Sequence, residues 1–158
     1  MSESVGVVEQ VASKHWECVT VAARDIFSET CATSLSPLPD GDSPKGNHIC
    51  GAISLTGDIA CSVFVALPPN TAVALAQAFA GFEIPFDSED MDDTVGELAN
   101  ILVGRVKEEL DKRGVAVEIS LPNVQRGSGN LAPGGDAPAK QGSFQVDAGK
   151  LWLGMFTG

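Results

Sequence analysis

The chain has 158 residues, of which 44% are hydrophobic and 20% are charged, and this composition is that of a globular rather than a disordered protein. Its formal net charge of -11 disfavours nucleic-acid binding, because an acidic surface repels phosphate backbones. The first residues lack the basic start of a signal peptide and no apolar run reaches the length of a membrane span, so we expect a cytoplasmic protein without a membrane partner.

The first predicted element is a long amphipathic helix over 5–33, where apolar residues recur at helical spacing. A segment rich in proline and glycine follows, and it predicts a loop over 37–46. Apolar residues then alternate over 48–67, which is typical of a β-hairpin. Gly57 and Asp58, between its two halves, predict a tight two-residue turn.

Two helices are predicted in the middle of the chain. The first is short and rich in alanine, covers 71–80, is capped by Asn70 or Thr71, and stops at Gly81. The second covers 88–113. It starts in a run of acidic residues and ends in basic ones, and both features suit the helix dipole.

The last third of the chain predicts β-structure. Alternating apolar residues, Leu121 among them, predict a strand over 115–124. Residues 127–142 are rich in Gly, Pro and Ala and are predicted to form a flexible loop. A final hairpin is expected over 143–157, turning near Ala148 and Gly149.

Hairpins imply antiparallel pairing, so the order of elements predicts an α+β fold. In this fold an antiparallel or mixed sheet carries the long helices on one face. The length of the chain fits a single domain over 1–158.

The helix predicted over 88–113 carries a polar stripe. At about 100° per residue, one narrow sector of the helical wheel holds Asp93, Glu97, Asn100, Gly104 and Asp111. The opposite half holds the residues that should pack on the sheet, which are Val95, Leu98, Ala99, Leu102, Val106 and Leu110. Asn100 and Gly104 are unfavourable residues in a helix interior. The stripe therefore suggests a docking surface rather than a merely solvated face.

The segment Asp93-Thr-Val-Gly-Glu97-Leu-Ala-Asn100, followed by Ile-Leu-Val-Gly104, resembles the motif helix of the CheC/CheX/FliY phosphatases. In that family Asp or Ser is followed after three residues by Glu and after two more by Asn. This chain matches the pattern at Asp93, Glu97 and Asn100. The order of the predicted elements is similar to that of the family over nearly the whole chain. Because only one copy of the motif is visible, the chain resembles the single-motif, CheX-like members.

The resemblance implies an enzyme that hydrolyses the aspartyl phosphate of a CheY-like response-regulator receiver domain. It assigns to Asn100 the positioning of the attacking water, and to Glu97 a contact with the active-site lysine of the receiver. Asp93 and Gly104 are expected to serve docking. The resemblance also implies a homodimer paired through the sheets, no cofactor or metal in this chain, and Mg²⁺ in the partner.

Other interpretations stay open. The same helix could dock a receiver domain in a chemotaxis or two-component pathway without catalysing hydrolysis, or the domain could serve oligomerisation alone. Cys50 and His48 are near each other in sequence, but their neighbouring strand positions favour a buried structural role over Cys–His catalysis. The four cysteines show no recognised zinc spacing, and we expect them to be reduced and mostly buried.

Overall fold

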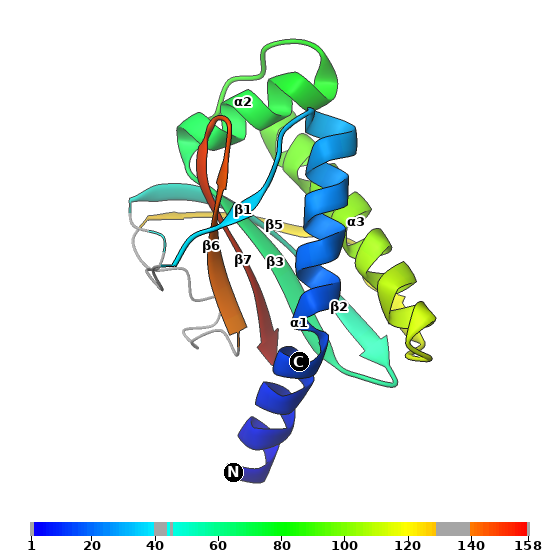
Figure 1. Ribbon diagram of the computed structural model, residues 1–158. Helices are drawn as coiled ribbons and strands as arrows, with labels where there is room; N and C mark the ends of the chain where they lie inside the picture. The colour runs from blue at the N-terminus through cyan, green and yellow to red at the C-terminus, as the bar shows by residue number, and fades with distance from the viewer. Residues whose placement is uncertain (1, 40–43, 45, 129–139, 158) are drawn as a thin grey trace.

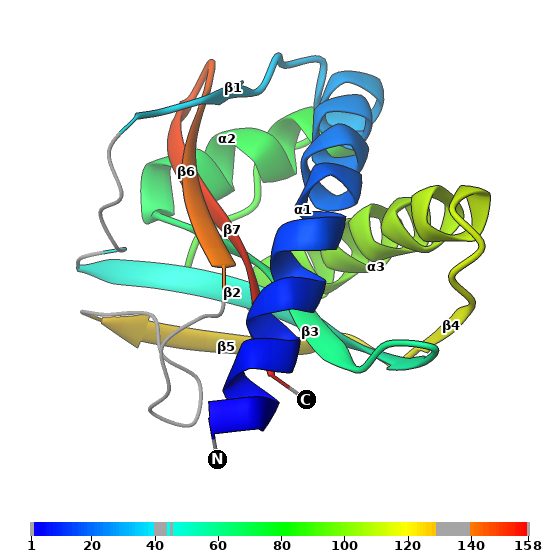
Figure 2. The ribbon, with the colours of Figure 1, turned by 60° about the horizontal axis from the view of Figure 1, so that its bottom comes forward.

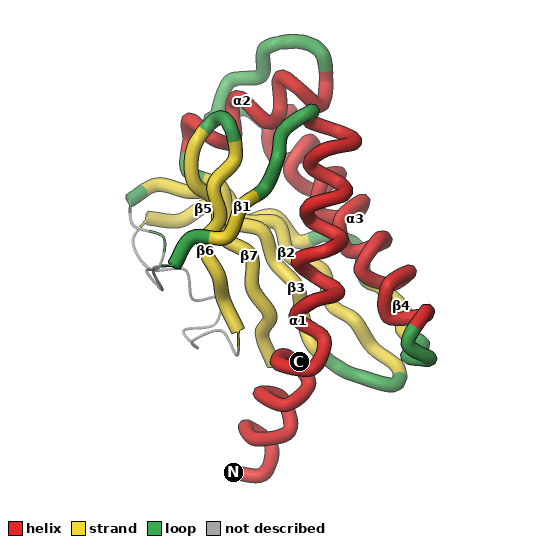
Figure 3. The backbone as a smooth tube through the Cα atoms, in the orientation of Figure 1, coloured by secondary structure: helices red, strands yellow, loops and turns green. Residues whose placement is uncertain are grey.

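The computed structural model describes residues 2–39, 44, 46–128 and 140–157. Its elements are α1 (Ser2–Cys31), β1 (Ser36–Pro37), β2 (Asn47–Gly57), β3 (Cys61–Leu67), α2 (Pro69–Ala80), α3 (Glu89–Lys112), β4 (Val117–Ile119), β5 (Asn123–Ser128), β6 (Lys140–Val146) and β7 (Gly149–Thr157). The described strands form one antiparallel sheet in the order β1-β6-β7-β3-β2-β4, with β5 also pairing with β2 (Figure 3). The predicted α+β fold with an antiparallel sheet is confirmed.

The helices pack on one face of this sheet, as predicted (Figure 1). Along β3, Val63, Val65 and Leu67 belong to the main core shared with the helices. The alternate residues Phe64 and Ala66 belong to a small apolar cluster on the other face. Figure 2 shows α1 lying between β6 and α3, and α1 contacts both of them.

Helix α1 confirms the helix predicted over 5–33, although it runs from Ser2 to Cys31. The next residue, Ala32, has a φ of 53°, and this left-handed conformation cannot continue a right-handed helix. Within the described residues, no helix is long and apolar enough to cross a membrane.

Helix α2 starts two residues before its predicted start at Thr71, and the predicted cap is wrong. Pro68 is the N-cap residue, and it makes no side-chain capping hydrogen bond. Pro69 at the first helical position has the φ that a helix needs and no N–H to satisfy. The hydroxyl of Thr71 instead donates to the carbonyl of Lys150 at 3.0 Å. Gly81 ends the helix as predicted, with a φ of 86°.

The hairpin predicted over 48–67 is present as β2 and β3, but its connection is longer than a two-residue turn. The last pair between the two strands is Leu55 with Cys61. Strand β2 then continues to Gly57, which pairs with Val117 of β4. A Cβ on Gly57 would lie 2.7 Å from the carbonyl oxygen of Ala116. This glycine therefore permits close approach of β4.

The strand predicted over 115–124 is divided into β4 and β5, which pair with successive parts of β2. Leu55 pairs with Ile119, and Ala52 pairs with Asn123. Between these pairs, two residues of β2 lie opposite three residues of the other strand. One extra residue on one side is a β-bulge.

The bulge lies in the connection between β4 and β5 and includes Leu121 and Pro122. Proline has no N–H for the ladder, so it suits such an interruption at the edge of a sheet. The extra residue reverses the alternation of the strand. Leu121, which the sequence pattern places with the inward-facing residues, is 88% exposed.

The final hairpin is present as β6 and β7, and Val146 pairs with Gly149 across a two-residue turn. Strand β6 begins at Lys140, so the predicted loop over 127–142 overlaps β5 and β6 at its ends. The interior of that loop, 129–139, lies outside the described residues. Strand β1 lies partly within the loop predicted over 37–46 and pairs with β6 at the edge of the sheet.

Candidate functional site

Helix α3 forms where the sequence predicts it, and its apolar side is buried. The Ser88 hydroxyl accepts a hydrogen bond from the Met91 N–H at 3.2 Å and caps the first turn. Acidic residues occupy that turn and Lys112 the last turn, as the helix dipole favours. The residues predicted to face the sheet are all buried, namely Val95, Leu98, Ala99, Leu102, Val106 and Leu110.

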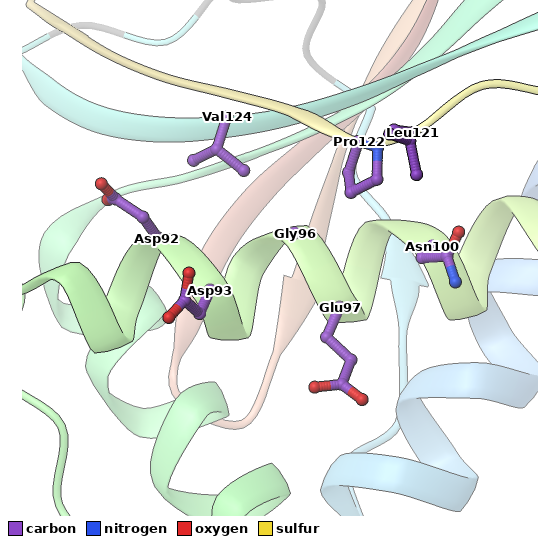
Figure 4. Close-up of a pocket in the computed structure, with 8 residues that line it drawn as sticks. All are labelled: Asp92, Asp93, Gly96, Glu97, Asn100, Leu121, Pro122 and Val124. Carbon is purple, nitrogen blue, oxygen red and sulfur yellow. The ribbon is translucent and has the colours of Figure 1, made fainter.

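The other side of α3 presents Asp93, Glu97 and Asn100, and all three side chains are exposed. Figure 4 shows them along the outer surface of the helix. Among the described residues, none of these three side chains has a hydrogen-bond or ion-pair partner. Their polar groups are therefore free to meet another molecule.

These three side chains line a groove of roughly 500 Å³ between α3 and the connection from β4 to β5. Leu121, Pro122 and Val124 form the wall on the strand side (Figure 4). The sequence pattern does not predict this wall, and the one sequence feature that points to it is Pro122, a proline inside an alternating strand pattern.

Gly96 lies in α3 between the two sides of the groove and is buried. A Cβ at this position would lie 3.4 Å from Cγ2 of Val124 and 3.6 Å from Cγ of Pro122. A Cβ here would therefore make only ordinary van der Waals contacts with the strand side, and an alanine would fit. The packing therefore does not explain this glycine, whose helix-interior position costs about 1 kcal/mol.

Arg126 of β5 links the strand side of the groove to the start of α3 by hydrogen bonds. Its guanidinium donates to Oδ1 of Asp92 at 2.7 Å and to the carbonyl of Ser88 at 3.2 Å. It also lies 4.8 Å from the ring centroid of Phe86, within the range of a cation–π contact. Asp92 lines the groove, but this bond ties it to the fold.

Arg105 fastens the helix to α1 on the other side. Its guanidinium lies 2.8 Å from Oε2 of Glu29 and 3.5 Å from Oδ2 of Asp25. The motif residues Asp93, Glu97 and Asn100 therefore belong to a helix that is anchored on both flanks while their own side chains stay unengaged.

Gly104 lies farther along α3 and is not among the residues that line the groove. Nothing outside the backbone of its own helix lies within 4 Å of the position that a Cβ would occupy there. The structure thus brings three of the four predicted site residues to one groove. It leaves the fourth as an open spot on the same helix.

The alternative pair of Cys50 and His48 is not arranged for catalysis. Nδ1 of His48 lies 3.2 Å from the carbonyl oxygen of Gly46, and both side chains are buried. Burial raises the pKa of Cys50 to about 12, so its thiol is protonated at neutral pH. All four cysteines are free and buried, as predicted.

Comparison with known proteins gives one family and several similar folds. The family model described as "Chemotaxis phosphatase CheX" matches residues 49–139. No curated protein sequence matches the chain. The chemotaxis protein CheX of Vibrio vulnificus has 17% identity and a TM-score of 0.77, covering 90% of this chain and 98% of its own.

Two further solved structures are similar over most of their length. The CheX of Desulfovibrio desulfuricans has 19% identity and a TM-score of 0.74, covering 92% of this chain and 99% of its own. A CheX–CheY–BeF3–Mg²⁺ complex from Borrelia burgdorferi gives 18% identity and a TM-score of 0.70, covering 90% of this chain and 96% of the other. At these identities the likeness concerns the fold.

Proposed function

This chain belongs to the CheX family of chemotaxis phosphatases, and on that premise we propose that it hydrolyses the aspartyl phosphate of a CheY-like receiver domain. In this proposal Asn100 positions the attacking water, and Glu97 contacts the active-site lysine of the receiver. The observation that carries the proposal is the unengaged row of Asp93, Glu97 and Asn100 along the groove.

Hydrolysis of an acyl phosphate requires water to attack phosphorus on the side opposite to the aspartate oxygen. The P–O bond then breaks, its electron pair stays with the aspartate carboxylate, and a water proton passes to the released phosphate. A carboxamide can donate and accept hydrogen bonds at once, so Asn100 can orient this water without ionising. Positioning and charge stabilisation are the main contributions that proteins make to phosphoryl transfer.

Glu97 is proposed to accept a charge-assisted hydrogen bond from the lysine of the receiver. Its carboxylate is exposed and lies one helical turn from Asn100, so one approach of the receiver can engage both. Asp93, one turn earlier, is proposed as a docking contact. Gly104 is proposed as a point of close approach, because nothing stands above it.

We place the Mg²⁺ ion in the receiver and propose that this chain brings no cofactor of its own. Support comes from the Borrelia CheX, which was solved together with CheY, BeF3 and Mg²⁺. In this proposal the receiver, with its Mg²⁺, neutralises the phosphoryl charge. This chain adds the ordered water.

The test is the decay of purified receiver domains, phosphorylated by a small-molecule phosphodonor, with and without this protein. Asn100→Ala should lower kcat by a few hundred-fold, because removing a water-positioning group costs about 3–4 kcal/mol. Glu97→Ala should also slow the decay. Asn70→Ala is a matched control, because Asn70 is exposed on α2 and lies outside the groove.

Wild-type turnover by Asn100→Ala would refute the role of that residue. Tight binding of the receiver without faster decay would instead identify the chain as a receiver-binding module. If no receiver is bound and none decays faster, the proposal fails and an oligomerisation domain becomes the better explanation.

A homodimer paired through the sheets also belongs to this proposal. Among the described residues, the outer sheet face carries an apolar cluster formed by Cys50, Phe64, Ala66, Trp152 and Phe156. Its members are already buried within one copy, so pairing there would add little apolar burial. Light scattering tests this part, because a mass of 16.4 kDa would mean a monomer.

A further inference from the structure

Leu121 stands apart from the other apolar residues of the described chain. Only two large apolar side chains are strongly exposed in these residues, Phe82 at 60% and Leu121 at 88%. Leu121 lies on the rim of the groove that Glu97 and Asn100 also line, whereas Phe82 does not. Single exposed apolar side chains are ordinary on protein surfaces, so what distinguishes Leu121 is its place on the groove beside the free polar side chains of Glu97 and Asn100.

The backbone on both sides of Leu121 is fixed. Before it, the Ser120 N–H donates to the Ser54 carbonyl at 3.0 Å, and the Ser120 hydroxyl accepts from the Ser54 N–H at 2.9 Å. After it, Pro122 has a restricted φ and lies against Gly96. The bulge between these two anchors turns the leucine outward, and bulges often redirect a side chain next to an active site.

We infer that Leu121 is the apolar anchor that determines the affinity of the groove for the phosphorylated receiver domain. The inference rests on the proposed function and adds a recognition residue to it. The matching surface on the receiver would be an apolar patch beside the phosphorylated aspartate, because Leu121 and Asn100 line one groove. Because the backbone around Leu121 is held in place before binding, docking costs little backbone conformational entropy.

Leu121 has no group that could act on phosphorus or on water, so its contact should be equal in the ground state and the transition state. Loss of such a uniform contact raises KM and leaves kcat unchanged. Burial of a leucine changes an affinity by about ten- to a hundredfold, and Leu121→Ser should raise KM by a factor in that range. Asn100→Ala should instead lower kcat.

The experiment measures kcat, KM and the equilibrium binding of a phosphorylated receiver for Leu121→Ser, Leu121→Met and Phe82→Ser. Leu121→Met keeps an apolar side chain of similar volume and should behave nearly as wild type. Phe82→Ser removes the other exposed apolar side chain and should change neither constant. All three variants should keep the wild-type melting temperature, because both sites are exposed.

A higher KM for Leu121→Ser alone, with kcat unchanged, supports the inference. A wild-type KM for Leu121→Ser overturns it, and the proposed phosphatase stands if the wild type still accelerates decay. If the wild type binds the receiver without hydrolysing it, the proposed function fails, and weaker binding by Leu121→Ser still supports the anchor. A wild type that binds no receiver overturns both.

Discussion

Gly104→Ala tests whether the glycine at this proposed docking position makes the protein less stable than an alanine would. Gly104 lies in the interior of the helix, where glycine is about 1 kcal/mol less favourable than alanine. Nothing outside the helix backbone lies within 4 Å of the new Cβ, so the methyl group meets no obstacle. We expect the free energy of unfolding to rise by about 1 kcal/mol and the melting temperature by about 2–4 °C.

Thermal unfolding followed by circular dichroism measures this gain, and Gly51→Ala is the matched control. Gly51 lies in β2, where a Cβ would be 3.0 Å from Cβ of Ala99 and 3.2 Å from Cγ1 of Val95. This crowding should lower the free energy of unfolding by about 1–3 kcal/mol. The same chemical change should therefore have opposite signs at the two glycines.

Turnover by Gly104→Ala then tests the docking role. If the receiver approaches the helix closely there, the added methyl group should raise KM about fivefold, which corresponds to about 1 kcal/mol. A melting temperature that falls or does not change would refute the propensity argument. An unchanged KM would refute the docking role of Gly104.

Two further predictions concern stability. Leu102→Ala should lower the free energy of unfolding by about 2–5 kcal/mol, because Leu102 is buried in the main core; an unchanged urea midpoint would mean that the buried side of α3 is assigned wrongly. Stability should also fall as the pH rises above about 9, because burial raises the pKa of Cys50 to about 12 and of Cys61 to about 11 from 9.0, so the unfolded chain loses these protons first. The slope is at most about 1.4 kcal/mol per pH unit for each thiol. Urea denaturation from pH 8 upward measures it, and Cys50→Ala should make the slope shallower; an equal slope would contradict this cause.

Both sides of α3 could be predicted from the sequence, because a helix fixes the direction of each side chain by its position alone. Leu102 therefore falls on the buried side and Asn100 on the exposed side without knowledge of the rest of the fold. The two ends of the helix are also indicated by residues close to them in sequence. Ser88 supplies the cap, and the glycine after Arg113 follows the last turn.

The strand side of the groove could not be predicted in the same way, because it depends on the register between strands distant in sequence. Alternation alone places Leu121 inward with Val117 and Ile119, and the one-residue bulge against β2 turns it outward. The position of Gly57 has the same origin. It is a turn residue by its local sequence, but its pairing with Val117 makes it part of the sheet.

The hydrogen bonds and ion pairs that hold α3 in place are separate from Asp93, Glu97 and Asn100. Damage to these three residues should therefore leave an intact protein that accumulates to its usual level. Under the proposed function, a form that has lost Asn100 but keeps Glu97 and Leu121 would still bind the phosphorylated receiver. In a cell that also makes the intact protein, this variant would compete with it for the phosphorylated receiver and shield the receiver from hydrolysis. The phosphorylated state would then last longer than in a cell that makes the intact protein alone.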